Sequence, residues 1–234
     1  MKFLGVLFLI VFNAAFIMAS EKPFKIVIDP GHGGTDLGAT RDSFIESKIV
    51  FEISMKVKEE LIKQNLSEIY LTREQDVLIP LKDRIKIAND LQADLFISLH
   101  ANTSTSPQLT GMEFYFNASS LAAQKNTTEK SLTNAQVIER IKNDFKHYEK
   151  TKQSLLLSKT VQARSQATVE KSVIKRAPYF VIENTDMPSI LIELGFISNR
   201  REAKKLANPE YQTEVAKIIA EAILEYKEKS DKTP

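Results

Sequence analysis

Two of the three histidines in this chain of 234 residues follow short apolar runs. His32 lies in a glycine-rich stretch after the run at 24–28, and His100 directly follows the run at 95–99. Apolar runs rich in β-branched residues are typical of buried strands, and open α/β sheets bind ligands at the carboxyl ends of their strands. We therefore expect both imidazoles on one rim of a sheet, close enough to share an ion.

Three carboxylates accompany these histidines. Two histidines with one carboxylate are a common open zinc set, and the absence of cysteine excludes thiolate ligands. Either Glu46 or Asp29 could complete the set, although Glu46 also suits a helix start and Asp29 a turn. Glu193 lies inside the apolar run at 189–194, where a charge is costly to bury, so it suits a general base. The alternative for Glu193 is an ion pair with a buried arginine.

Strand and helix patterns alternate along the chain. Apolar residues recur every three or four positions from Glu46 to Leu61, which predicts a helix with one buried face. The alternation predicts a single α/β domain with a mostly parallel twisted sheet and helices on both faces. The remaining expected strands are 67–72, 95–99, 111–116, 179–182 and 189–194, and the remaining helices are 81–91, 199–206 and 209–222.

Residues 118–172 interrupt this pattern with a polar helical insert. Ile138, Ile141, Phe145 and Tyr148 follow helical spacing, and a second, weaker helix is expected around 156–167. The insert is longer than a crossover between strands needs. A helix within residues 118–150 could restrain the active site, with its apolar stripe docked on the domain; the alternative is an ordinary packed helix pair.

The net charge and the first twenty residues bear on the partners and the location of the protein. The net charge is only +2, which argues against nucleic acid as a partner. Residues 1–20 combine Lys2 with an apolar run and a small-residue exit, which predicts a cleaved secretory signal rather than a short membrane anchor. The working domain is then 21–234, periplasmic or secreted, with no stable membrane span after cleavage.

Several motifs resemble one enzyme family over residues 25–226. The runs IVIDPGHGGTDLGA, LTREQDVLIPLKDRIKIAN, ADLFISLHAN, GMEFYF and MPSILIELGFISN are similar to those of the zinc-dependent N-acetylmuramoyl-L-alanine amidases of the Amidase_3 type. The resemblance implies that His32, Glu46 and His100 bind Zn²⁺, and that Glu193 is the catalytic residue. It also implies peptidoglycan as substrate, cut between N-acetylmuramic acid and the L-alanine of the stem peptide.

The insert resembles that of the subgroup acting in daughter-cell separation. That resemblance implies a helix covering the zinc, an acid from it (Glu129 or Glu139) in the open position, and an activator protein that displaces it. Two other functions remain open for this sequence. One is a zinc peptidase that cuts the stem peptide, and the other is a non-catalytic wall-binding module that keeps the fold.

Overall fold

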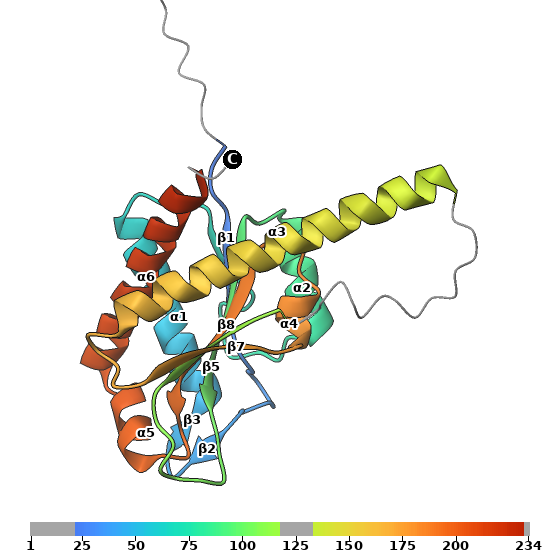
Figure 1. Cartoon of the computed structure of the whole chain (residues 1–234). Helices are drawn as coiled ribbons and strands as arrows, with labels where there is room; N and C mark the ends of the chain where they lie inside the picture. Colours follow the sequence, from blue (N-terminus) through green and yellow to red (C-terminus); the bar gives the residue numbers. More distant parts are fainter. Residues whose placement is uncertain (1–21, 118–132, 232–234) are drawn as a thin grey trace, which may run out of the picture.

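A six-stranded sheet forms the centre of the computed structural model, which describes residues 22–117 and 133–231 (Figure 1). The predicted signal at 1–20 and Glu129 lie outside the described residues. In spatial order the strands are β4 (Ile69–Leu71), β1 (Ile26–Pro30), β5 (Leu95–Asn102), β8 (Ser189–Phe196), β6 (Met112–Phe116) and β7 (Ser172–Arg176). Strands β4, β1, β5 and β8 pair in parallel, and β6 meets β8 antiparallel. A separate hairpin pairs β2 (Thr40–Arg41) with β3 (Phe44–Ile45).

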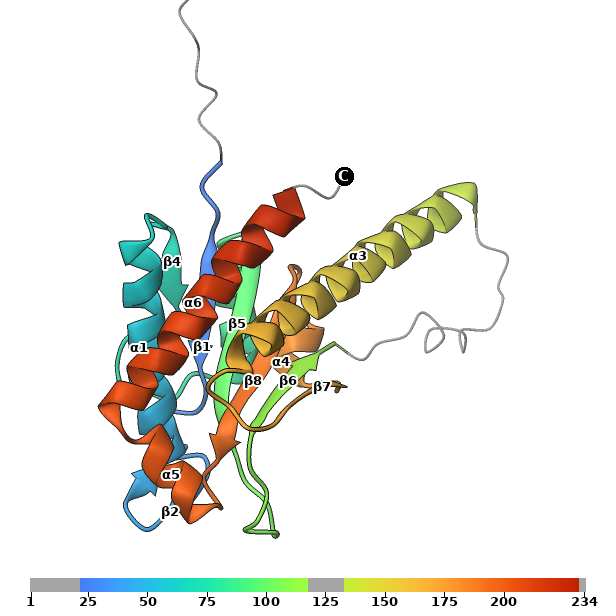
Figure 2. The same cartoon turned by 60° about the vertical axis from the view of Figure 1, so that its left-hand side comes forward.

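Helices cover both faces of the sheet (Figures 1 and 2). One face carries α1 (Glu46–Lys63), α3 (Asn134–Ser165) and α6 (Pro209–Asp231). The other face carries α2 (Leu81–Asp90) and α4 (Phe180–Glu183), while α5 (Arg200–Leu206) follows β8. The predicted α/β domain with a mostly parallel sheet is therefore confirmed.

The central strands are apolar throughout because both of their faces are covered. Successive side chains of a strand point to opposite faces. In β1, Ile28 therefore packs in the core below α1, α3 and α6, while Val27 packs in the core below α2 and α4. In β8, Ile192 likewise packs in the first core and Leu191 in the second. Two hydrophobic cores, one on each face, therefore hold the strands whose carboxyl ends form the rim of the sheet.

The expected strand at 179–182 is wrong, because this segment forms helix α4. The ammonium of Lys150 on α3 donates hydrogen bonds to the carbonyl oxygens of Ile182, Glu183 and Thr185 at 2.8, 3.1 and 2.6 Å. These bonds satisfy carbonyls at the end of a short helix, which a strand there would have paired with a neighbour. The position beside β6 is instead filled by β7, a half-exposed strand that the sequence reading missed.

Two expectations for the insert are also wrong. A single helix, α3, replaces the two expected, and it contains neither glycine nor proline to break it. The expected docking of its stripe does not occur, since Ile141 is 61% and Phe145 64% exposed. Figure 2 shows the first half of α3 projecting away from the sheet. Within the described parts of the chain, no helix is both long and apolar enough to cross a membrane.

Candidate active site

The candidate residues lie on one rim and largely on one face of the sheet. His100 of β5 is directly opposite Glu193 of β8, and Glu193 is directly opposite Glu113 of β6. Residues paired in register point to the same face, so these three side chains form a row across adjacent strands. His32 follows β1 and Glu46 begins α1, which brings both to the same rim. The structure therefore brings together the four residues expected from the sequence.

His32, Glu46 and His100 form a compact group of potential metal ligands. Glu46 Oε1 lies 3.1 Å from His32 Nε2 and 3.0 Å from His100 Nδ1. One ligand atom from each residue lies within 4.8 Å of the others. Zinc sites with an open position use two or three such nitrogen and oxygen ligands, so the donor set and its spacing fit this ion.

Asp36 orients His32 within this group. Its Oδ2 lies 2.8 Å from His32 Nδ1, which leaves Nε2 directed at Glu46. Metal-binding histidines commonly bond a carboxylate through their second nitrogen, which fixes the ring and its tautomer. His32 also has a positive φ of 58°, a conformation that non-glycine residues adopt mainly where surrounding contacts impose it.

Two glycines leave room for the group. A Cβ on Gly31 would lie 2.4 Å from the His100 ring, and a Cβ on Gly38 would lie 2.5 Å from Glu46 Oε2. Gly38 also has a positive φ of 66°, which other residues adopt at a cost. The glycine-rich stretch is therefore required by close approach of backbone to the two ligand side chains.

Asp29 does not belong to the ligand group. Its buried carboxylate accepts hydrogen bonds from Thr72 and Ser98 at 2.5 and 2.8 Å, and pairs with Arg84 at 2.8 Å. Arg84 also donates to the carbonyl of His32 at 2.7 Å. The buried ion pair of Arg84 with Asp29 thus supports the loop that carries His32.

The electrostatics of the group favour a cation. Burial by itself would raise the pKa of Glu46, but hydrogen bonds with His100 and His32 outweigh burial and hold this pKa well below its usual range. Burial would lower the pKa of His32, yet Glu46 and Asp36 raise it to about 9. A buried, ionised carboxylate therefore attracts positive charge, and a bound metal would release the proton from His32.

Glu193 differs from Glu46 in having no partner. It is 9% exposed, and its Oε2 is buried without a hydrogen-bond partner among the residues that the structure describes. Burial is the main cause that raises its pKa to about 7; His100 opposes this effect, and Glu46 and Glu113 add to it. The alternative of an ion pair with a buried arginine is wrong for the described residues, because Arg84 pairs with Asp29 and Arg73 donates to the carbonyl oxygens of Pro30, Gly31 and Ser47.

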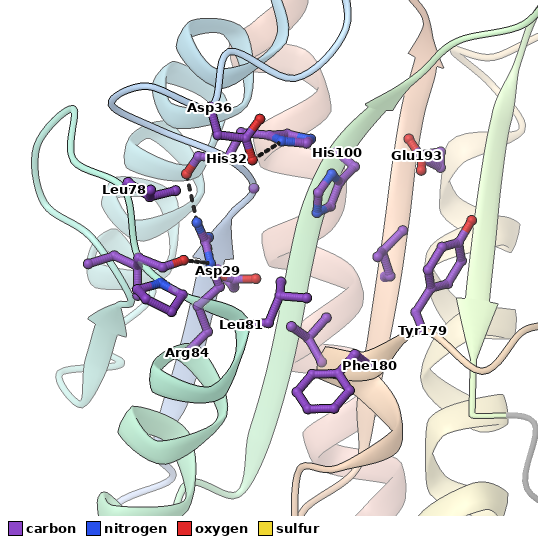
Figure 3. Close-up of a pocket in the computed structure, with 15 residues that line it drawn as sticks. Asp29, His32, Asp36, Leu78, Leu81, Arg84, His100, Tyr179, Phe180 and Glu193 are labelled. Atoms are coloured by element: carbon purple, nitrogen blue, oxygen red, sulfur yellow. Dashed lines mark hydrogen bonds and ion pairs between the residues drawn. The ribbon is translucent and has the colours of Figure 1, made fainter.

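A pocket of about 290 Å³ opens beside this row (Figure 3). One wall comes from the start of α2 and includes Leu81, and the opposite wall includes Tyr179 and Phe180 at the start of α4. His100 and Glu193 face the space between these walls. Both walls carry apolar side chains, and polar groups, among them His32, His100 and Glu193, line the same pocket, a combination that is usual for ligand sites.

Sequence reasoning missed four residues of this region. Asp36 follows His32 by four positions in a glycine-rich turn, a spacing that could have suggested a bond to the imidazole. Glu113 and Tyr115 alternate with buried residues in β6, and the predicted strand alone would have placed them on one face. No local signal indicated that Tyr179 would line the pocket, because that depends on α4.

The comparisons with known proteins agree with this geometry. A family model described as N-acetylmuramoyl-L-alanine amidase (Amidase_3) matches residues 26–225. The chain belongs to this amidase family. AmiC, an N-acetylmuramoyl-L-alanine amidase of Escherichia coli O6:H1, is 31% identical over 224 residues, which cover 88% of this chain and 53% of AmiC. The chain therefore spans about half the length of that amidase.

Solved amidase structures share the fold. The catalytic domain of CwlV, an N-acetylmuramoyl-L-alanine amidase from Bacillus (Paenibacillus) polymyxa, superposes with a TM-score of 0.69 at 28% identity and covers 88% of this chain and 98% of that one. The CwlD amidase from Clostridioides difficile, solved in complex with the GerS lipoprotein, has a TM-score of 0.69 at 26% identity with the same two coverages.

Proposed function

We propose that this chain is an N-acetylmuramoyl-L-alanine amidase that hydrolyses peptidoglycan. The bond cut is the amide between the lactyl group of N-acetylmuramic acid and the L-alanine of the stem peptide. The observation that carries the proposal is the opposition of His100 and Glu193 on adjacent strands, beside His32 and Glu46. This arrangement places three potential metal ligands and the carboxyl group of Glu193 on one rim of the sheet, and a metal-dependent amide hydrolase needs both.

His32, Glu46 and His100 would hold a zinc ion. When bound, zinc lowers the pKa of water and polarises a carbonyl group. Asp36 and Arg84 keep the His32 loop in position through the bonds described above. The buried Glu46 supplies the negative charge that favours the ion over a proton.

Glu193 would act first as general base and then as general acid. Its buried carboxylate takes a proton from the attacking water and transfers it to the leaving nitrogen of L-alanine. A pKa raised to about 7 by burial suits both transfers near neutral pH. Its unbonded Oε2 leaves an oxygen available for that proton.

Digestion of purified peptidoglycan with and without a chelator tests the proposal. The expected products are intact stem peptides with a free L-alanine amine, identified by mass, and the chelator should stop their release. Cleavage within the stem would favour the zinc peptidase. Binding without any product would favour the wall-binding module.

The roles within the site can be separated by substitution. We expect Glu193→Gln to keep the metal and lose hydrolysis by about a hundredfold or more, because it removes the proton acceptor but no ligand. His32→Ala or His100→Ala should lower both metal content and activity. Loss of metal from Glu193→Gln would instead make Glu193 a ligand.

We further propose that residues 1–20 are removed and that the enzyme works in the periplasm or as a secreted protein. Relatives named as N-acetylmuramoyl-L-alanine amidases support an extracytoplasmic location, because the bond in that name belongs to peptidoglycan. Fractionation of cells followed by mass measurement of the mature chain tests both points. A chain that retains residues 1–20 in the membrane fraction would contradict cleavage.

We also propose that the insert restrains the enzyme until an activator protein binds. Glu139 lies on the exposed part of α3 and does not line the pocket, so its role as a blocking acid has no support in the described residues. The exposed stripe and the complex of the CwlD amidase with the GerS lipoprotein support a protein partner. An activator that prefers the unrestrained form would shift the equilibrium by that preference.

Replacement of the projecting first half of α3 by a short linker tests restraint directly. This part carries the exposed stripe and does not dock on the domain, so the domain should still fold without it. Hydrolysis measured without a partner should rise if the insert restrains the site. Unchanged low activity in a zinc-loaded protein would contradict restraint.

A further inference from the structure

Glu193 Oε2 accepts no hydrogen bond from the described residues, although three hydrogen-bond donors lie close by. Glu113, directly opposite Glu193 on β6, is surrounded by them. Its Oε2 accepts hydrogen bonds from the amide of Asn102 at 3.0 Å and from the hydroxyl of Tyr115 at 2.5 Å. Its Oε1 accepts a bond from the ammonium of Lys175 at 2.6 Å. One carboxylate of the facing pair therefore has three donors, and the other has an oxygen with none.

Any of these donors would impair a proton-transferring carboxylate. A charged or hydroxyl donor bonded to a carboxylate favours its ionised form and occupies a lone pair. The three donors come from β5, β6 and β7, whose side chains here share the face of Glu193. Asn102 and Tyr115 lie on the strands adjacent to β8, where diagonal neighbours are about 7–8 Å apart and within reach of a long side chain, whereas Lys175 lies one strand further away on β7 and bonds Glu113 on β6.

We propose that Glu113 is a positioning residue that binds Asn102, Tyr115 and Lys175 and thereby keeps Glu193 unbonded for proton transfer. This inference rests on the proposed role of Glu193 as general base. Glu113 does not contact the substrate in this proposal. It acts by fixing which of two facing carboxylates receives the available donors.

The charge distribution supports this division of roles. A carboxylate directly opposite Glu193 on the adjacent strand disfavours ionisation of Glu193. The pKa of Glu193 is raised, mainly by burial, and Glu113 contributes to the increase. Burial and the bond to Glu113 also raise the pKa of Tyr115, so its hydroxyl stays a donor.

The donor side chains are themselves held in place. The Tyr115 ring meets the Tyr179 ring edge-on, with centroids 5.0 Å apart and planes at 88°. The Lys175 ammonium lies 5.6 Å from the centre of the Tyr115 ring, within the range of a cation–π contact. Loss of the Glu113 carboxylate would release these donors beside Glu193 rather than remove them.

Steady-state kinetics of Glu113→Ala on a soluble disaccharide muropeptide test the proposal. We expect kcat to fall about tenfold to a hundredfold, because a bonded Glu193 transfers protons poorly. KM should change by less than about threefold and zinc content should stay unchanged, because neither binding wall nor ligands are altered. Glu170→Ala, which removes an exposed acid paired with Arg201, is the matched control and should behave as the parent.

Second-site substitutions provide the decisive comparison. Adding Tyr115→Phe or Lys175→Ala to Glu113→Ala removes a released donor, and at least one double variant should recover about fivefold or more in kcat over the single variant. A merely structural role predicts further loss in both double variants. Recovery in neither, or a kcat for Glu113→Ala within about twofold of the parent, would overturn the proposal.

Two further measurements remove the remaining ambiguity. Glu113→Gln keeps the side-chain volume and one acceptor, so it addresses the same question if Glu113→Ala does not fold; its kcat should also fall. An active parent whose Glu193→Gln variant is inactive establishes the base separately. Under that result, a normal Glu113 variant refutes only this inference and leaves the amidase assignment intact.

Discussion

Asp36 is the residue through which the geometry of His32 is most directly controlled. We predict that Asp36→Ala lowers zinc affinity about tenfold to a hundredfold, because the imidazole loses the bond that fixes its tautomer and orientation. Competition with a chelating indicator measures the affinity. Glu74→Ala, an exposed acid paired with Lys58, is the control and should bind zinc as the parent does. Equal affinities in the two variants would show that Asp36 does not support the metal group.

The buried Glu193 also affects stability. Its pKa rises from 4.5 in the unfolded chain to about 7 in the folded protein, mainly through burial. Between these values the unfolded chain loses the proton and the folded chain keeps it, so stability falls as pH rises and levels off above the folded pKa.

We therefore predict a difference between the parent and Glu193→Gln that grows with pH. From about pH 4.5 to about pH 8 the parent should lose roughly 3 kcal/mol of unfolding free energy relative to the variant, which has no such carboxyl. Urea denaturation of the metal-free proteins at both pH values measures this. Parallel pH curves would mean that Glu193 is ionised in the folded state throughout.

The sequence predicted the four candidate residues from their places in recognisable elements. His32 and His100 follow apolar runs, Glu46 begins a helix, and Glu193 is a charge inside an apolar run. The residues alone could not show whether Glu46 or Asp29 joins the two histidines as the third ligand, since both lie at suitable positions. The structure separates them by partners that are distant in sequence, namely Thr72, Ser98 and Arg84. Long-range contacts of this kind have no local signature.

At the level of elements, Lys150 links α3 to α4. Its three carbonyl bonds end the helix whose start carries Tyr179 and Phe180 into the pocket. Burial lowers the pKa of Lys150 to about 8, which leaves most of the side chain charged at neutral pH. The wall of the pocket thus depends on a helix whose first half projects from the domain.

We predict that Lys150→Met lowers the unfolding free energy by about 3 kcal/mol, because buried carbonyls lose their donors. Lys146→Met, one turn earlier and 64% exposed at its side chain, should change it by no more than about 0.5 kcal/mol. Chemical denaturation of both variants makes the comparison. Similar stabilities would mean that water replaces the ammonium.

Elements with strong periodicity were predicted well, and those defined by tertiary contacts were not. Helix α1 and strand β5 follow their hydrophobic patterns. The apolar segment Tyr179–Ile182 suits a strand by composition, yet the bonds from Lys150 favour a helix. Strand β7 is polar and half exposed, so its composition could not distinguish it from a loop.

For the whole molecule, metal binding should couple to stability. The proposed ligands come from the loop after β1, the start of α1 and the end of β5, and an ion would connect all three. We predict that chelation lowers the free energy of unfolding by about 4 kcal/mol when free zinc exceeds its dissociation constant a thousandfold. Thermal melting with chelator, then with zinc restored, measures the change. An unaltered melting temperature would contradict zinc binding by the folded state.

The position of β8 in the sheet has a consequence for how the chain is made. β8 lies between β5 and β6, yet it follows both by more than seventy residues in the sequence. A ribosome or a translocation channel delivers β5 and β6 first, with facing edges that have no partner until residues 189–196 emerge. Glu193 arrives in that same segment. Chains that end before residue 196 therefore lack both the joined sheet and the proposed base, so hydrolytic capacity arises only after that segment has been made.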